Sequence, residues 1–226
     1  MKILVSLKRT ADPDNANKIK VAPGGAKIVT DGLENKLNPF DEYAVETALR
    51  LVENGKVRIA GDTVSVVSLG PKETTGNIRQ ALAMGADTGA LFLTDDESLD
   101  GDLVARALAK VVEQQKPDLV ILGKQAVDGD SNQVAQGLAE LLGWPSATFA
   151  MSINLAADKK TVTVGREARR LDAVAPRAVY QIDQAVSFVA ERLPDETQAR
   201  LTLGELESLM VSHINWLHGK DSFPPT

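Results

Sequence analysis

The sequence predicts an α/β protein in which a doubly wound, mostly parallel sheet is covered by helices on both faces. Short runs that are apolar throughout alternate with segments of helical periodicity. Such runs are typical of strands buried on both faces, and the short links between them fit right-handed βαβ crossovers. A chain of 226 residues that is 43% hydrophobic and 25% charged also has the composition of a globular protein with a sizeable core.

Four apolar runs are expected to form strands buried on both faces of this sheet. Each is rich in small or branched apolar residues and is bounded by polar or turn-forming residues. They lie at residues 3–7, 63–68, 89–93 and 118–122. The segment 177–182 predicts one more strand.

Amphipathic helices are expected between the strands. At the start of the first helix, Asn38 is a candidate N-cap and Pro39 suits the first helical position, while Gly55 is a candidate terminator. Two further helices are predicted at residues 73–84 and 101–115. A last one follows a polar loop, ends at Gly143 and is expected to bury Val134, Leu138, Leu141 and Leu142.

The pattern changes after Trp144. Residues 147–167 predict two strands around a polar turn at 158–160, which is typical of an antiparallel hairpin at the sheet edge. Near the C-terminus, Thr202 and Glu205 match a capping box ahead of an apolar stripe that predicts a helix. The chain is therefore divided into an α/β domain at 1–184, expected to bind a nucleotide, and a helical tail at 185–226.

Charge and composition argue against several classes of function. The net charge of −6 and the lack of a Lys and Arg cluster disfavour binding to nucleic acid or to an anionic membrane. The absence of Cys removes disulfides, thiolate nucleophiles and Cys-ligated metals. The only two histidines, His213 and His218, are too few to indicate a His-based metal site. The first apolar run is too short for a signal sequence or a membrane span, which predicts a cytoplasmic protein.

A polar loop at residues 123–131 is the candidate site. It follows one predicted strand and precedes a helix, and ligands of open parallel sheets bind at the carboxyl ends of strands. Gly123 and Gly129 permit close approach of the backbone, and the free N–H groups of the next helix start are suited to a phosphate. These residues indicate a nucleotide-binding loop.

Two other interpretations of this loop stay open on the residues alone. Asp and Asn ahead of a helix most often serve as caps and turn formers. Asp128 and Asp130 also match a pair of catalytic carboxylates, although the sequence does not fix their separation. The chain has no Walker A loop and no G-x-G-x-x-G opening a helix, and Ser131 lacks a G-x-S-x-G setting.

Four segments carry a resemblance to a known family: "MKILVSLKR" at the start, "NKLNPFDEYAVETALRL" at 35–51, "IRQALAMGAD" at 78–87 and "GKQAVDGDSNQVAQGLAELLGWPSATFA" at 123–150. Over about residues 1–167 the chain resembles the beta subunits of electron transfer flavoproteins, the FixA-like family. The resemblance implies a Rossmann-like fold of the adenine nucleotide alpha hydrolase type.

The resemblance also implies a function in electron transport. Such beta subunits pair with an alpha subunit, and the heterodimer carries a redox FAD held mainly by alpha. It accepts electrons from flavin dehydrogenases and passes them to a quinone oxidoreductase or another acceptor. The beta subunit holds a structural AMP and has no catalytic residues of its own.

Carried onto this sequence, the AMP site consists of residues at strand ends and helix starts. They are Ser6, Asn38, Pro39, Phe40, Leu69, Gly123, Gln125, Asp128, Asp130, Asn132, Gln133 and Val134.

Two departures from the family pattern leave alternatives open. Many members that bind AMP have Thr where this chain has Val134, and a DGD start with Val also occurs in bifurcating members that bind a second FAD. The sequence after about residue 167 lacks the family's basic loop that docks on dehydrogenases. A stand-alone nucleotide-binding or regulatory domain is therefore a further alternative.

Overall fold

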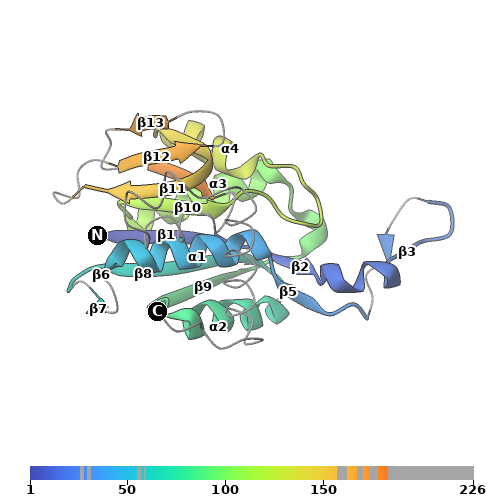
Figure 1. Ribbon diagram of the computed structural model, residues 1–226. Coiled ribbons are helices and arrows are strands. Elements are labelled where there is room, and N and C mark those ends of the chain that lie inside the picture. The colour runs from blue at the N-terminus through green and yellow to red at the C-terminus, as the bar shows by residue number, and fades with distance from the viewer. Residues whose placement is uncertain are drawn as a thin grey trace, which may run out of the picture.

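An eight-stranded sheet forms the centre of the computed structural model, which describes residues 1–25, 28–29, 32–54, 57–58, 60–156, 162–166, 170–173 and 178–182 (Figure 1). The strand order is β13-β12-β11-β14-β10-β1-β8-β9. These strands are β1 (Lys2–Leu7), β8 (Thr63–Gly70), β9 (Thr88–Leu93), β10 (Leu119–Gly123), β11 (Ser146–Leu155), β12 (Val162–Arg166), β13 (Arg170–Ala173) and β14 (Ala178–Ile182).

The sheet reverses its winding direction beside β1. From β1 the chain adds β8 and β9 on one side, then crosses back and places β10 on the other side. Each pair of neighbouring strands from β9 to β11 is parallel, and β12 runs antiparallel to both of its neighbours, β11 and β13. The predicted doubly wound, mostly parallel sheet is confirmed, and its switch point lies between β1 and β10.

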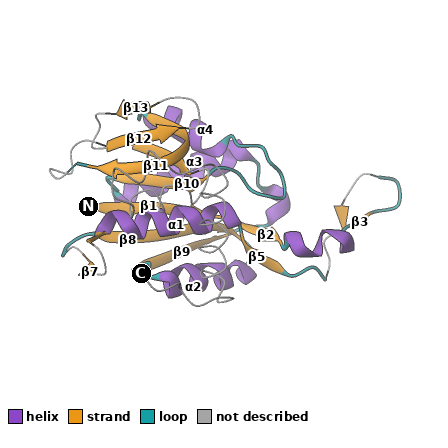
Figure 2. Ribbon diagram, in the orientation of Figure 1, coloured by secondary structure: helices purple, strands orange, loops and turns teal. Residues whose placement is uncertain are grey.

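In the described part of the chain, four α-helices cover the two faces of the sheet (Figure 2). They are α1 (Pro39–Val52), α2 (Thr75–Met84), α3 (Gly101–Gln115) and α4 (Val134–Leu142). Ile3 and Val5 of β1 pack in the cluster that contains α1 and α2, whereas Leu4 packs in the cluster that contains α3 and α4. Because successive strand residues face opposite sides, an uninterrupted apolar run supplies both clusters.

The helix ends follow the sequence signals in part. Gly85 and Gly143 close α2 and α4 with φ of 126° and 63°, a region that favours glycine. Pro39 is the first residue of α1, as predicted. Gly55 is not the terminator of α1, because the helix already ends at Val52 and Glu53 after it is extended.

Two expectations about burial are wrong. Residues 89–93 do not form a strand buried on both faces: β9 is the last strand in the order, and Phe92 and Leu93 are 44% and 71% exposed. Leu141 of α4 is 51% exposed, whereas Leu138 on the same helix is fully buried. An apolar run gives the strand but not its place in the sheet, and only that place decides which faces are covered.

The predicted hairpin is confirmed, as β11 and β12 pair antiparallel. It is not the outermost element, because β13 adds a third strand beyond β12, and β14 enters the sheet between β10 and β11. The strand β13 was missed because its short sequence, RLDA, has no apolar run. The turn at 158–160 and the tail at 185–226 lie outside the described residues, so the division into domain and tail stays a prediction.

Residues between β1 and α1 form a projecting arm that the strand pattern did not predict (Figure 1). At its base, β2 (Arg9–Ala11) pairs antiparallel with β5 (Asn35–Leu37), which returns the chain to the start of α1. The short elements of the arm and of the loops elsewhere are η1 (Pro13–Lys18), β3 (Lys20–Val21), β4 (Ile28–Val29), β6 (Glu53–Asn54), β7 (Val57–Arg58), η2 (Lys72–Thr74) and η3 (Asp96–Ser98). In the described part of the chain, every helix is too short or too polar to cross a membrane.

The two leucines of α4 should respond very differently to truncation. Leu138→Ala should lower the free energy of unfolding by about 2–5 kcal/mol, because it removes a buried side chain and leaves a cavity. Leu141→Ala, on the exposed side of the helix, should change it by less than about 0.5 kcal/mol. Urea unfolding of both variants checks this difference, and equal losses would contradict the orientation of α4.

Candidate functional site

A cavity of about 550 Å³ opens beside the switch point. Its walls are the carboxyl ends of β1, β8 and β10, the loop after β10, and the starts of α3 and α4. Cavities of 300–1,000 Å³ are typical of small-molecule sites, and this edge of a doubly wound sheet is where ligands bind. The cavity is therefore the candidate site of the chain.

The cavity gathers most of the residues that the sequence assigned to a site. Pro39, Phe40 and Asp130 lie outside its lining. The nine that line it come from four separate parts of the chain: Ser6, Asn38, Leu69, Gly123, Gln125, Asp128, Asn132, Gln133 and Val134.

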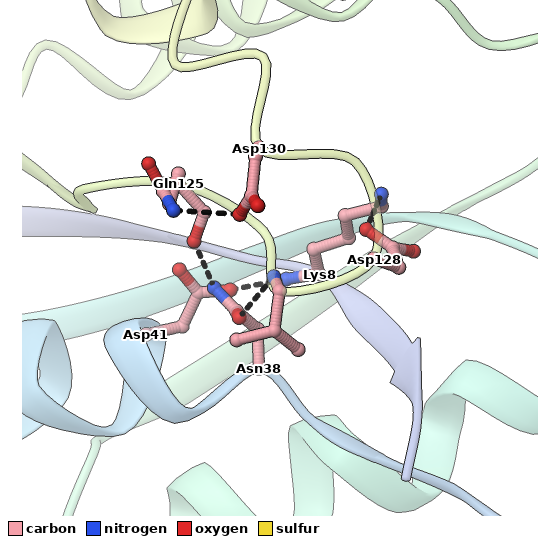
Figure 3. A network of polar contacts seen from close by, with 7 residues as sticks. Lys8, Asn38, Asp41, Gln125, Asp128 and Asp130 are labelled. Carbon is pink, nitrogen blue, oxygen red and sulfur yellow. Dashed lines mark hydrogen bonds and ion pairs between the residues drawn. The ribbon is translucent and has the colours of Figure 1, made fainter. Parts of the chain in front are cut away.

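Asn38 connects the start of α1 to the loop after β10 (Figure 3). Its Nδ2 donates to the Gln125 carbonyl at 2.8 Å, and its Oδ1 accepts from the Val127 N–H at 3.2 Å. Asn38 occupies the N-cap position of α1 but makes no side-chain cap bond, so the expected capping role is wrong. The side chain is 1% exposed and is used to hold the loop instead.

Asp41 is a buried carboxylate in the first turn of α1. Its Oδ2 accepts from the Lys8 N–H at 2.7 Å, which ties the end of β1 to the helix start. Burial raises the pKa of Asp41 to about 7, although hydrogen bonds from Lys8, Asn38 and Gly123 oppose the rise. This carboxyl, which lies beside the cavity, therefore titrates near neutral pH.

Gly123 permits a close contact within the protein. A Cβ on Gly123 would lie 2.3 Å from Asp41 Oδ1 and 2.7 Å from the Phe40 carbonyl carbon, so only glycine lets α1 approach the end of β10 this closely. The situation at Gly129 is the opposite, because a Cβ there would meet no atom within 4 Å. The space next to Gly129 is open, but Gly129 is not among the residues that line the cavity.

The two loop carboxylates have different partners (Figure 3). Asp128 Oδ1 accepts from Lys8 Nζ at 2.7 Å, and Asp130 Oδ1 accepts from Gln125 Nε2 at 2.6 Å. Each carboxylate is thus engaged by a different side chain of the protein. Among the described residues, no three His, Cys, Asp or Glu side chains come together as a metal site.

The start of α4 is free of a side-chain cap and faces the cavity. Its N-cap residue Gln133 makes no cap bond, and Gln133, Val134 and Ala135 all line the cavity. The first N–H groups of a helix have no partner within the helix, and the helix dipole makes this end positive. The arrangement suits an anion such as a phosphate.

Several lining residues were missed by the sequence reasoning. Lys8 and Arg9 follow β1 at its carboxyl end, where the fold predicts ligand contacts, so their position gave a signal. Gly101 at the start of α3 had the same signal. No sequence signal pointed to Gln181, because it lies within the buried strand β14. This strand reaches the cavity only because it pairs with β10.

Gly123 and Gly129 offer a matched pair of substitutions. Gly123→Ala should lower the free energy of unfolding by about 1–3 kcal/mol, because the new methyl group forces α1 away from β10. Gly129→Ala should leave it within about 0.5 kcal/mol of the wild-type value. Thermal or urea unfolding tests the pair, and a tolerated alanine at 123 would refute the close packing described here.

Asp41 should give the stability of the protein a distinct pH dependence. Its pKa rises from 3.8 to about 7 on folding, so its neutral form contributes stability below pH 3.8 that is lost as the pH rises through about 7. Relative to Asp41→Asn, which has no ionisation, the wild type should lose up to about 4 kcal/mol over this range. Urea unfolding at several pH values measures the difference, and a relative gain of the wild type with pH would contradict it.

Comparison with known proteins agrees with this architecture. Residues 25–178 match the electron transfer flavoprotein domain family. The chain is 45% identical over 163 residues to an electron transfer flavoprotein subunit beta of Bradyrhizobium diazoefficiens, a match that covers 72% of this chain and 63% of the relative. It is 41% identical over 208 residues to the Mus musculus electron transfer flavoprotein subunit beta, a match that covers 91% of this chain and 73% of the relative. The Homo sapiens electron transfer flavoprotein subunit beta is 46% identical over 165 residues, a match that covers 72% of this chain and 62% of the relative. The chain therefore belongs to the electron transfer flavoprotein family, in which these relatives are beta subunits.

Proposed function

We propose that the chain is the beta subunit of a heterodimeric electron transfer flavoprotein and that its cavity holds one AMP as a structural ligand. The observation that carries the proposal is the cavity at the switch point of the sheet, onto which the uncapped start of α4 opens. Family membership supports the role in electron transport, and the cavity supports a bound nucleotide.

The residues around the cavity fit an adenine nucleotide. The N–H groups at the start of α4 and the ammonium of Lys8 would hold the phosphate. Leu69, Leu99 and Val104 form an apolar part of the lining that suits a purine ring. Asn38 and Gly123 would shape the site indirectly, because their contacts are to the protein itself.

The electron-carrying part of the proposal rests on the partner. An FAD held mainly by an alpha subunit would supply the redox chemistry, receiving electrons from flavin dehydrogenases and passing them to a quinone oxidoreductase or another acceptor. The role of this chain is to bind and to orient, without catalytic residues of its own. The engagement of Asp128 and Asp130 with Lys8 and Gln125 supports a nucleotide that is held and not turned over.

A second candidate is a subunit that binds a second FAD in place of AMP. Val134 favours it, because this side chain lines the cavity at the start of α4 and cannot donate to a phosphate oxygen. With Val104 it extends the apolar lining that a flavin ring would use. AMP is preferred because the neighbouring segments SNQ at 131–133 and GWPSATFA at 143–150 resemble those of family members that bind AMP.

Native mass spectrometry of the chain, co-expressed with the product of the neighbouring gene, tests the proposal. A one-to-one complex that carries one AMP and one FAD is expected, and acid should release the AMP unchanged. Asp128→Asn should retain the nucleotide, because this carboxylate pairs with Lys8 and performs no chemistry.

Any other composition of the complex would favour one of the alternatives or overturn the proposal. A complex with two FAD molecules would replace the AMP assignment with the second candidate. A complex with neither nucleotide would overturn the proposal. A chain that stays a monomer or homodimer beside its neighbour, with AMP bound, would instead indicate a stand-alone nucleotide-binding domain.

A further inference from the structure

Gln181 is a polar residue in an otherwise apolar part of the core. It lies on β14, where its neighbours Val179, Tyr180 and Ile182 are buried, and it is itself 2% exposed. We propose that Gln181 is a positioning residue, which sets the affinity of the cavity for the phosphate of its ligand by holding both ends of the loop 124–132. This inference rests on the proposed nucleotide site and adds a determinant that the loop sequence does not contain.

A single amide group of Gln181 joins the two ends of the loop. Its Nε2 donates to the Lys124 carbonyl at 2.6 Å and also to Asn132 Oδ1. Lys124 directly follows β10, and Asn132 stands two residues before α4. Because a backbone carbonyl can only accept, the contact with Lys124 fixes which end of the Gln181 amide faces the loop.

The loop conformation needs such support. Asp130 and Asn132 have φ of 49° and 50°, a left-handed conformation that is unfavourable for residues other than glycine, although Asn and Asp tolerate it best. Lys124 is also held by its side chain, whose Nζ lies 4.9 Å from the centre of the Phe149 ring on β11. The loop is thus anchored to the two strands that follow β10 in the order of the sheet.

The direction of the free N–H groups depends on this anchor. Asn132 and Gln133 lead directly into α4, and both line the cavity. Gln133 makes no cap bond, whereas the contact of Gln181 with Asn132 ties the residue just ahead of the helix start to β14. Loss of this link should therefore affect a ligand with a phosphate more than one without it.

Core packing does not explain the amide of Gln181. Its Oε1 is buried and has no hydrogen-bond partner among the described residues, which is unfavourable for a polar atom. An apolar side chain of similar size would fill the same volume without this unpaired oxygen. Two observations explain the amide: its Nε2 donates two hydrogen bonds to the loop, and Gln181 lines the cavity.

Gln136 provides a matched control. Its Nε2 donates to the same Asn132 Oδ1, at 3.3 Å, and its Oε1 is also buried and unpaired. It does not line the cavity. Replacement of Gln136 therefore removes a contact of Asn132 and an unpaired oxygen while leaving the link from β14 to both loop ends.

The test compares Gln181→Met with Gln136→Met in the full chain, purified as the complex that it forms. Calorimetry gives the Kd of AMP and of adenosine after release of the nucleotide that copurifies. Gln181→Met should weaken AMP binding about tenfold, the effect expected when a helix N–H at the start of α4 no longer donates well to the phosphate. Adenosine has no phosphate, and its binding should weaken less than about threefold. Gln136→Met should change both less than about threefold. Amide exchange at 124–133 in the nucleotide-free protein should be faster only in Gln181→Met.

The outcomes separate this inference from the proposed function. Absence of AMP binding in the wild type would overturn both. Wild-type binding of AMP with equal losses for AMP and adenosine in Gln181→Met, or with no loss, would overturn the role of Gln181 alone. If Gln181→Met does not fold, Gln181→Asn is used, because its shorter amide cannot reach Lys124 and Asn132 together, and the same loss of selectivity for AMP is required.

Discussion

The close packing of the start of α1 against the end of β10 is the constraint on which the site depends. Gly123 leaves room for Phe40 and Asp41, and Asn38 donates to and accepts from the backbone of the following loop. Asp41 adds a contact to the backbone of Lys8 after β1. Two neighbouring strands and one helix are thereby fixed where the winding of the sheet reverses. The cavity exists because these three elements cannot move apart independently.

The polar residues of the loop after β10 serve the structure first. Asp128 and Asp130, which match a catalytic pair in the sequence, engage Lys8 and Gln125, and Asn132 accepts from Gln181. The loop is thus held by Lys8 just after β1, by Asn38 just before α1 and by Gln181 on β14. A loop held in this way is suited to keep a ligand in one position, since little conformational freedom is left to be lost on binding. Such rigidity agrees with the proposed structural nucleotide.

The apolar pattern identified the strands of the sheet, because a strand that is covered on both faces needs apolar residues at successive positions. Ile3, Leu4 and Val5 alternate between the two helical layers, so a continuous apolar run could only belong to a covered strand. The same argument failed for Phe92 and Leu93, since the pattern does not say which strand ends the sheet. The loop and its glycines were found from their position between a strand and a helix. The separate partners of its two acids were beyond the sequence, because spacing along a chain does not fix distance in space.

The sequence by itself determined the type of the main strands and helices and their order along the chain, the edge of the sheet at which the cavity lies, and membership in the electron transfer flavoprotein family. These follow from local periodicity, helix-end signals and a long motif, all of which are readable along the chain. Only the tertiary structure decided that Asn38 holds a loop and caps no helix, that Asp41 is a buried acid, and that Gln181 reaches the cavity. The physical reason is that each of these roles depends on partners about 30 to 90 residues away in the sequence, which only the packing of the sheet brings together.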